Sequence, residues 1–171
     1  MGSITIITGI MAAGKSTVAQ ALAERLPHSV HVRGDVFRKM IVSGRDEITP
    51  SPSAEAVAQL QLRYELGAMV TARYCDAGFD VVLQDIILGE DLRTVVRLLG
   101  DRTIRIVVLC PSPDAVAERE ARRHKTGYVD GWTPAALDRE LRETTGGIGF
   151  WLDTSGLTVE ETVDRIMEWI G

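Results

Sequence analysis

The sequence has few aromatic residues, few cysteines and no long hydrophobic run. Phe, Trp and Tyr make up 5% of the 171 residues, and the tryptophans are not interleaved with basic residues as in a base-stacking platform. Cys75 and Cys110 lack the paired spacing of a zinc site or a disulfide framework. The longest uncharged stretch, residues 1–14, is too short to span a bilayer and has no basic leader. We therefore expect a cytoplasmic protein without a membrane partner.

An excess of positive charge is also missing. Lys and Arg number 19 against 24 Asp and Glu, which gives a net charge of −5 at pH 7. The chain therefore has no general attraction for nucleic acid, although a single 5′ end would need only a local basic pocket. The length and the 45% hydrophobic content suit one domain over residues 1–171 with a sizeable core.

A glycine-rich motif follows the first apolar run, residues 4–8. Residues 9–17 read Gly-Ile-Met-Ala-Ala-Gly-Lys-Ser-Thr, which has the Gly-x4-Gly-Lys-Ser spacing of a P-loop. The glycines let successive N–H groups converge on one anion at the N-terminus of the following helix. Lys15 would reach the β- and γ-phosphates, and the Ser16 hydroxyl would bind Mg²⁺. The predicted nucleotide site comprises Gly9, Ala12, Ala13, Gly14, Lys15, Ser16 and Thr17.

Strand and helix patterns alternate along the chain, which favours a parallel sheet covered by helices on both faces. A long helix is predicted to open at Ser51-Pro52, and others at Ser112-Pro113 and Thr133-Pro134. Thr158 and Glu161 form a capping box before the last helix. Strands are predicted at residues 3–8, 29–33, 79–83, 104–109 and 149–152.

Two acidic residues follow predicted strands at the edge where open α/β sheets bind ligands. Asp35 follows the second strand and is a candidate general base, and Arg38 would share its side of the next helix. The alternative is an Asp helix cap with a solvated Arg. Asp85 follows the third strand and would either hold a Mg²⁺-bound water or orient an acceptor hydroxyl, unless it is only a loop residue.

A basic cluster lies near the end of the helix after the fourth strand. Residues 119–125 contain four basic residues and one acidic residue. Arginines on a closing lid, here predicted at about 119–132, can neutralise the charge of a transferring phosphoryl group. The alternative is a solvated helix face. The predicted phosphate-facing residues are Arg119, Arg122 and Arg123.

These features together resemble the P-loop kinases of small hydroxyl acceptors. The chain is most similar to chloramphenicol phosphotransferase-like proteins and to the kinase domain of polynucleotide 5′-hydroxyl kinases, with shikimate and gluconate kinases as more distant relatives. The resemblance implies a three-layer, nucleoside-kinase-like P-loop fold with a lid and a five-stranded parallel sheet in the order 2-3-1-4-5. It also implies ATP with Mg²⁺ as the phosphate donor, Asp35 as the base, and Arg38 and Asp85 near the acceptor.

Three functions follow as hypotheses. The first is ATP-dependent phosphorylation of a small-molecule hydroxyl, and the second places that hydroxyl at the 5′ end of a nucleoside or nucleic acid. The third is a regulatory ATP-binding module without kinase activity. The Asn-Lys-x-Asp pattern of guanine-specific GTPases is missing from the chain.

Overall fold

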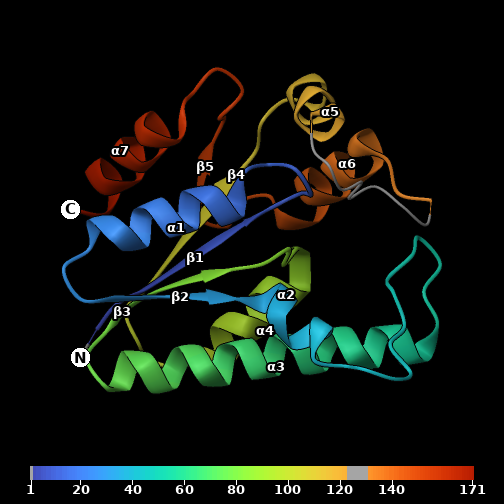
Figure 1. Cartoon of the computed structure of the whole chain (residues 1–171), viewed down its shortest axis with the longest axis horizontal. Helices are drawn as coiled ribbons and strands as arrows, with labels where there is room; N and C mark the ends of the chain where they lie inside the picture. Colours follow the sequence, from blue (N-terminus) through green and yellow to red (C-terminus); the bar gives the residue numbers. More distant parts are fainter. Residues whose placement is uncertain (1, 123–130) are drawn as a thin grey trace.

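A five-stranded parallel sheet in the order β2-β3-β1-β4-β5 forms the centre of the computed structural model, which describes residues 2–122 and 131–171 (Figure 1). This order and the parallel pairing confirm the predicted architecture, and each strand lies within one residue of its predicted bounds. The strands are β1 (Ile4–Gly9), β2 (Ser29–Arg33), β3 (Asp80–Gln84), β4 (Ile104–Leu109) and β5 (Phe150–Leu152).

Helices cover both faces of the sheet (Figure 1). Along β1, Ile6 packs with α3 and α4, whereas Ile7 packs with α1 and α7, as the two-residue side-chain period of a strand requires. Both faces are therefore buried, which explains the near-continuous apolar strands. The helices are α1 (Lys15–Arg25), α2 (Gly34–Lys39), α3 (Ala54–Asp76), α4 (Gly89–Leu99), α5 (Pro113–Ala121), α6 (Pro134–Thr145) and α7 (Val159–Ile170).

Three of the four helix starts that were predicted from capping residues follow the expected chemistry. Ser112 and Thr133 accept hydrogen bonds from backbone N–H groups three residues on, and both bonds of the Thr158–Glu161 capping box are present. The start of α3 differs from the prediction. Its cap is Ser53, whose Oγ accepts from the Ala56 N–H at 2.9 Å, so the helix starts after Pro52 rather than at it.

The carboxyl ends of β1, β2 and β3 open toward one edge of the sheet. The loop after β1 leads into α1, β2 passes directly into α2, and β3 is followed by Asp85. Because these strands are hydrogen-bonded neighbours, their loops meet there. Among the described residues, no helix is long and apolar enough to cross a membrane.

Candidate active site

The loop between β1 and α1 has the backbone of an anion cradle. Gly9, Ala12 and Gly14 have φ angles of 143°, 61° and 91°, a region that residues with a Cβ rarely adopt. A Cβ at Gly9 would also lie 2.4 Å from the Leu109 carbonyl oxygen. The glycine spacing recognised in the sequence thus corresponds to a strained turn directly before a helix N-terminus.

Lys15 and Ser16 are the first residues of α1 and line the cleft above the loop. The Lys15 side chain is largely buried, and its Nζ donates to the Ile10 carbonyl at 2.7 Å. The Ser16 hydroxyl donates to Oε1 of Gln84 at 3.1 Å. Gln84, the last residue of β3, was not identified from the sequence, which drew attention to Asp85 instead.

Asp85 forms a buried ion pair with Arg63 of α3. The Asp85 residue is 2% exposed; Arg63 Nε donates to its Oδ2 at 2.7 Å, and Nη2 contacts Oδ1. The Ile86 N–H also donates to Oδ1, at 2.7 Å. Burial raises the pKa of Asp85, while the Arg63 guanidinium acts in the opposite direction. Arg63 was missed in the sequence because nothing local distinguishes it from a solvated helix arginine.

Asp35 lies at the rim of the same cleft, in α2. Its carboxylate contacts Arg38 Nε at 3.0 Å and Lys39 Nζ at 2.5 Å. Partial burial raises the pKa of Asp35, but the hydrogen bonds from Lys39 and Arg38 outweigh burial and leave it below the ordinary value. Arg38 also contacts Glu47, in the loop before α3. Asp35 is therefore ionised at neutral pH and able to accept a proton.

Of the three arginines predicted to face the phosphates, the structure places one in the cleft and one outside it. Arg119 of α5 reaches the P-loop: Nη1 is 3.4 Å from the Ala13 carbonyl oxygen, and Nη2 donates to the Thr154 carbonyl at 2.6 Å. Arg122 does not line the cleft. Its side chain is 81% exposed and lies 3.8 Å from Glu118, because the helix turns it toward solvent. Arg123 and most of the predicted lid lie outside the described residues.

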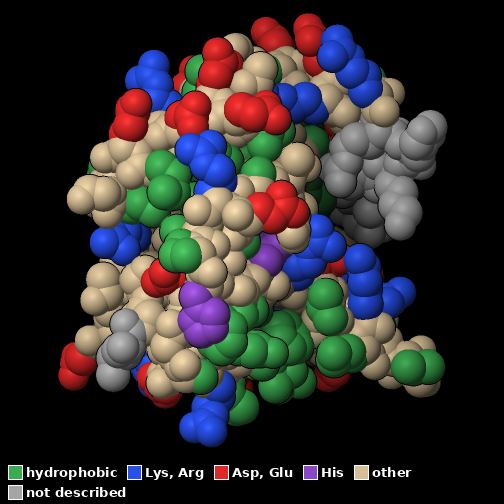
Figure 2. Space-filling view, turned by 60° about the vertical axis from the view of Figure 1, so that its left-hand side comes forward, with side chains coloured by type: hydrophobic (Ala, Val, Ile, Leu, Met, Phe, Trp, Pro, Cys, Tyr) green, Lys and Arg blue, Asp and Glu red, His purple; other side chains and the backbone are tan. Residues whose placement is uncertain are grey.

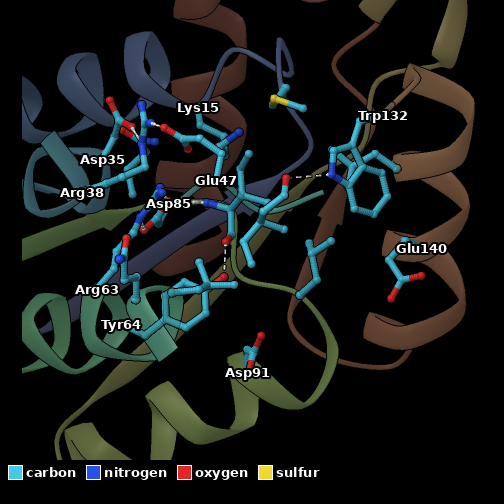
Figure 3. Close-up of a pocket in the computed structure, with 18 of the residues that line it drawn as sticks. Lys15, Asp35, Arg38, Glu47, Arg63, Tyr64, Asp85, Asp91, Trp132 and Glu140 are labelled. Atoms are coloured by element: carbon cyan, nitrogen blue, oxygen red, sulfur yellow. Dashed lines mark hydrogen bonds and ion pairs between the residues drawn. The ribbon is translucent and has the colours of Figure 1, made fainter. Parts of the chain in front are cut away.

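A cleft of about 1230 Å³ joins these groups (Figure 3). On the side opposite Asp35 and Arg38 it is lined by Trp132 and Glu140 (Figure 3), and Trp132 Nε1 donates to the Ile48 carbonyl at 3.2 Å. Gly9 and Ala13 do not contribute to its surface. The predicted residues that line it are Ala12, Gly14, Lys15, Ser16, Thr17, Asp35, Arg38, Asp85 and Arg119.

The family follows from comparison with known proteins. A profile of the AAA domain family matches residues 4–144, which covers most of the chain and the whole P-loop. The chain belongs to the AAA domain family.

Several proteins that are similar to this chain carry kinase names. A UPF0200 protein of Aeropyrum pernix is 36% identical over an alignment of 128 residues that covers 72% of this chain and 66% of that protein, so the match spans just under two thirds of the relative. A cytidylate kinase of Chromobacterium violaceum is 24% identical, over 97% of this chain and 94% of the kinase. The structure of a sugar kinase from Janibacter sp. HTCC2649 superposes with a TM-score of 0.69 at 17% identity, covering 99% and 95% of the two chains. The fold is that of the P-loop kinases.

Proposed function

We propose that this protein is an ATP-dependent kinase that transfers the γ-phosphoryl group to a hydroxyl of a small molecule, with Asp35 as general base. One observation carries the proposal: the ionised Asp35 and the P-loop residues Lys15 and Ser16 line the same cleft. A phosphate cradle by itself indicates nucleotide binding, and the carboxylate across from it adds a proton acceptor.

The donor side of the cleft suits the triphosphate of ATP. The Lys15 ammonium, now bonded to the Ile10 carbonyl, is the cation that the β- and γ-phosphates would attract. Arg119 also lines the cleft, where it contacts the backbone of Ala13 and Thr154. Ser16 would hold Mg²⁺, which supplies charge neutralisation when bound and usually takes few protein ligands beside phosphate oxygens and waters.

The chemistry assigned to Asp35 is proton removal. As the acceptor oxygen forms its bond to the γ-phosphorus, the bond from that phosphorus to the β–γ bridging oxygen breaks and ADP leaves. Asp35 takes the hydroxyl proton. Its lowered pKa, caused by Lys39 and Arg38 in opposition to burial, keeps the carboxylate free of a proton until that step.

The acceptor side favours an alcohol over a phosphate. Its three basic side chains already contact carboxylates: Arg38 contacts Asp35 and Glu47, Lys39 contacts Asp35, and Arg63 contacts Asp85. An acceptor phosphate, such as that of cytidylate, would have to compete with these carboxylates for the cations. The face of the molecule in Figure 2 mixes Lys and Arg with Asp and Glu, so that face offers no continuous basic surface to a long nucleic acid.

An acceptor screen tests the proposal. Purified protein with ATP and Mg²⁺ is assayed for ADP release and for labelled product with sugars, amino sugars, antibiotic alcohols, nucleosides and cytidylate. We expect transfer to an alcohol. Transfer to cytidylate alone would overturn the alcohol assignment, and release of phosphate only to water would favour a regulatory ATPase.

A matched pair of variants tests the base. Asp35→Asn should lower turnover by about 10²–10⁴-fold while ATP binding, measured by calorimetry, stays near the wild-type value. Asp76→Asn is the control, because Asp76 pairs with Arg102 at the end of α3, outside the cleft lining. Undiminished turnover of Asp35→Asn would remove Asp35 from the role.

A further inference from the structure

A line of polar side chains runs from the surface of α1 to the P-loop hydroxyl. Gln20 Nε2 donates to Glu24 Oε1 at 2.9 Å, and Gln20 Oε1 lies 2.9 Å from Nδ1 of His31 on β2. At the other end, Ser16 donates to Oε1 of Gln84 at 3.1 Å. The gap in this line lies between the side chains of His31 and Gln84.

The direction of these hydrogen bonds follows from Glu24. An ionised carboxylate only accepts, so the Gln20 amide must turn its nitrogen to Glu24 and its oxygen to His31. Nδ1 of His31 therefore carries the ring proton, and in the neutral imidazole Nε2 is a bare acceptor. Burial, and the nearby charge of Arg33, lower the pKa of His31 and favour this neutral form.

Nε2 of His31 is buried and has no hydrogen-bond partner among the described residues. The β2–β3 register pairs His31 with Val82 and Arg33 with Gln84, so His31 and Gln84 are diagonal neighbours on one face of the sheet. Their side chains lie within interaction distance, because Gln84 acts on the pKa of His31 and raises it, against the larger lowering by burial. Because Oε1 of Gln84 accepts from Ser16, the amide nitrogen of Gln84 is the group that could turn to Nε2 as a donor.

We infer that Gln84 is a positioning residue for Mg²⁺: with its amide nitrogen directed to His31, its Oε1 accepts the Ser16 proton and leaves the Ser16 lone pairs for the ion. The opposite amide orientation would present N–H groups to Ser16 and compete with the metal for those lone pairs. An outer partner of this kind typically changes metal affinity by about 10–100-fold. The inference rests on the proposed function, because it requires nucleotide and Mg²⁺ at the P-loop.

Calorimetric titration of ATP, once with Mg²⁺ and once with EDTA, tests the inference without an acceptor. Gln84→Met keeps the side-chain length but removes both polar groups. We expect its Kd for Mg·ATP to rise about tenfold and its Kd for metal-free ATP to match the wild type. Gln84→Glu, which still offers an oxygen to Ser16, should retain the Mg²⁺ dependence.

Two further variants separate the chain of bonds from general packing. His31→Phe removes the partner of the Gln84 amide, and it should weaken Mg·ATP binding about threefold, the value of one modest hydrogen bond. Gln61→Met is the control, since the Gln61 amide donates to Asp91 and Gln61 lies outside the cleft lining. It should bind Mg·ATP as the wild type does.

The outcomes separate this inference from the proposed function. If wild-type protein binds no ATP in either condition, the proposed function fails. If wild type shows a Mg²⁺-dependent Kd and Gln84→Met is unchanged, or loses affinity equally with Mg²⁺ and with EDTA, only the role of Gln84 is overturned. Failure of Gln84→Glu to retain Mg²⁺ dependence would also overturn it.

Discussion

A single added methyl group at Gly34 should break the buried ion pair beneath the cleft. Gly34 is the first residue of α2 and has no positive φ, so alanine fits its backbone. A Cβ built there would lie 1.8 Å from Oδ2 and 2.4 Å from Cγ of Asp85. Atoms in contact need roughly 3.5 Å, so the Asp85 carboxylate must move by well over 1 Å and leave Arg63.

The expected cost follows from the burial of this pair. The side chains of Arg63 and Asp85 are 14% and 3% exposed, and separating such partners typically costs about 3–5 kcal/mol. Replacing glycine with alanine stabilises the fold by about 0.4–1 kcal/mol, because it lowers the conformational entropy of the unfolded chain. The net loss for Gly34→Ala is therefore about 2–5 kcal/mol. With a urea m-value of about 2 kcal/mol/M, the unfolding midpoint falls by about 1–2.5 M.

Urea unfolding followed by circular dichroism measures this shift. Gly156→Ala is the matched control, because a Cβ there meets nothing within 4 Å and its φ is not positive; its midpoint should stay within about 0.3 M of the wild type. In an Asp85→Ala background the obstructing carboxylate is gone and only the Cβ of residue 85, at 2.9 Å, stays close to the new methyl group, so the same Gly34→Ala change should cost clearly less than it does in the wild type. An equal cost in both backgrounds would refute the clash as the cause.

Two other predictions follow from charged groups at the cleft. Arg119→Leu should raise the Kd for ATP about tenfold, the value of a hydrogen bond to a charged group, without changing the unfolding midpoint by more than about 0.5 M of urea; calorimetry and urea unfolding measure the two effects. The pKa of Asp35 is lowered in the fold because Lys39 and Arg38 outweigh burial, so its ion pairs contribute stability above the unfolded pKa of about 3.9 and lose it as pH falls through the folded pKa. The loss of stability below pH 4 should be smaller in Asp35→Asn, as unfolding at a series of pH values would reveal.

The fold could be predicted because its signals are local. Most strands are short apolar runs bounded by turn residues, whereas β2 reads Ser-Val-His-Val-Arg, and parallel order follows from the alternation with helices. The start of α3 was misplaced because Ser51-Pro52 and Ser53 offer competing caps within three residues. The serine that caps the helix is the one whose Oγ reaches a free backbone N–H group. This depends on three-dimensional geometry, which the sequence does not show.

The cleft likewise has one part that could be predicted from local sequence and one part that could not. Apart from Arg119, its donor half comes from the continuous segment between β1 and α1, so the spacing of Gly9, Gly14 and Lys15 sufficed to locate it. The remaining contacts are assembled across the chain: Arg63 reaches Asp85 over 22 positions, and Gln84 meets Ser16 of the donor half over 68. No periodicity encodes such a pairing, because it depends on the register of β3 against β1 and β2.

The difference between the two halves of the cleft affects how the proposed reaction would select its acceptor. The P-loop contacts are largely backbone groups and would accept the same triphosphate in any kinase of this fold. The wall that we propose for the acceptor is instead formed by residues of α2, α3, α4, α6 and the loop before α3, where Asp35, Arg38 and Glu47 restrain one another. Substitutions in this wall can therefore change the acceptor while leaving the nucleotide cradle intact.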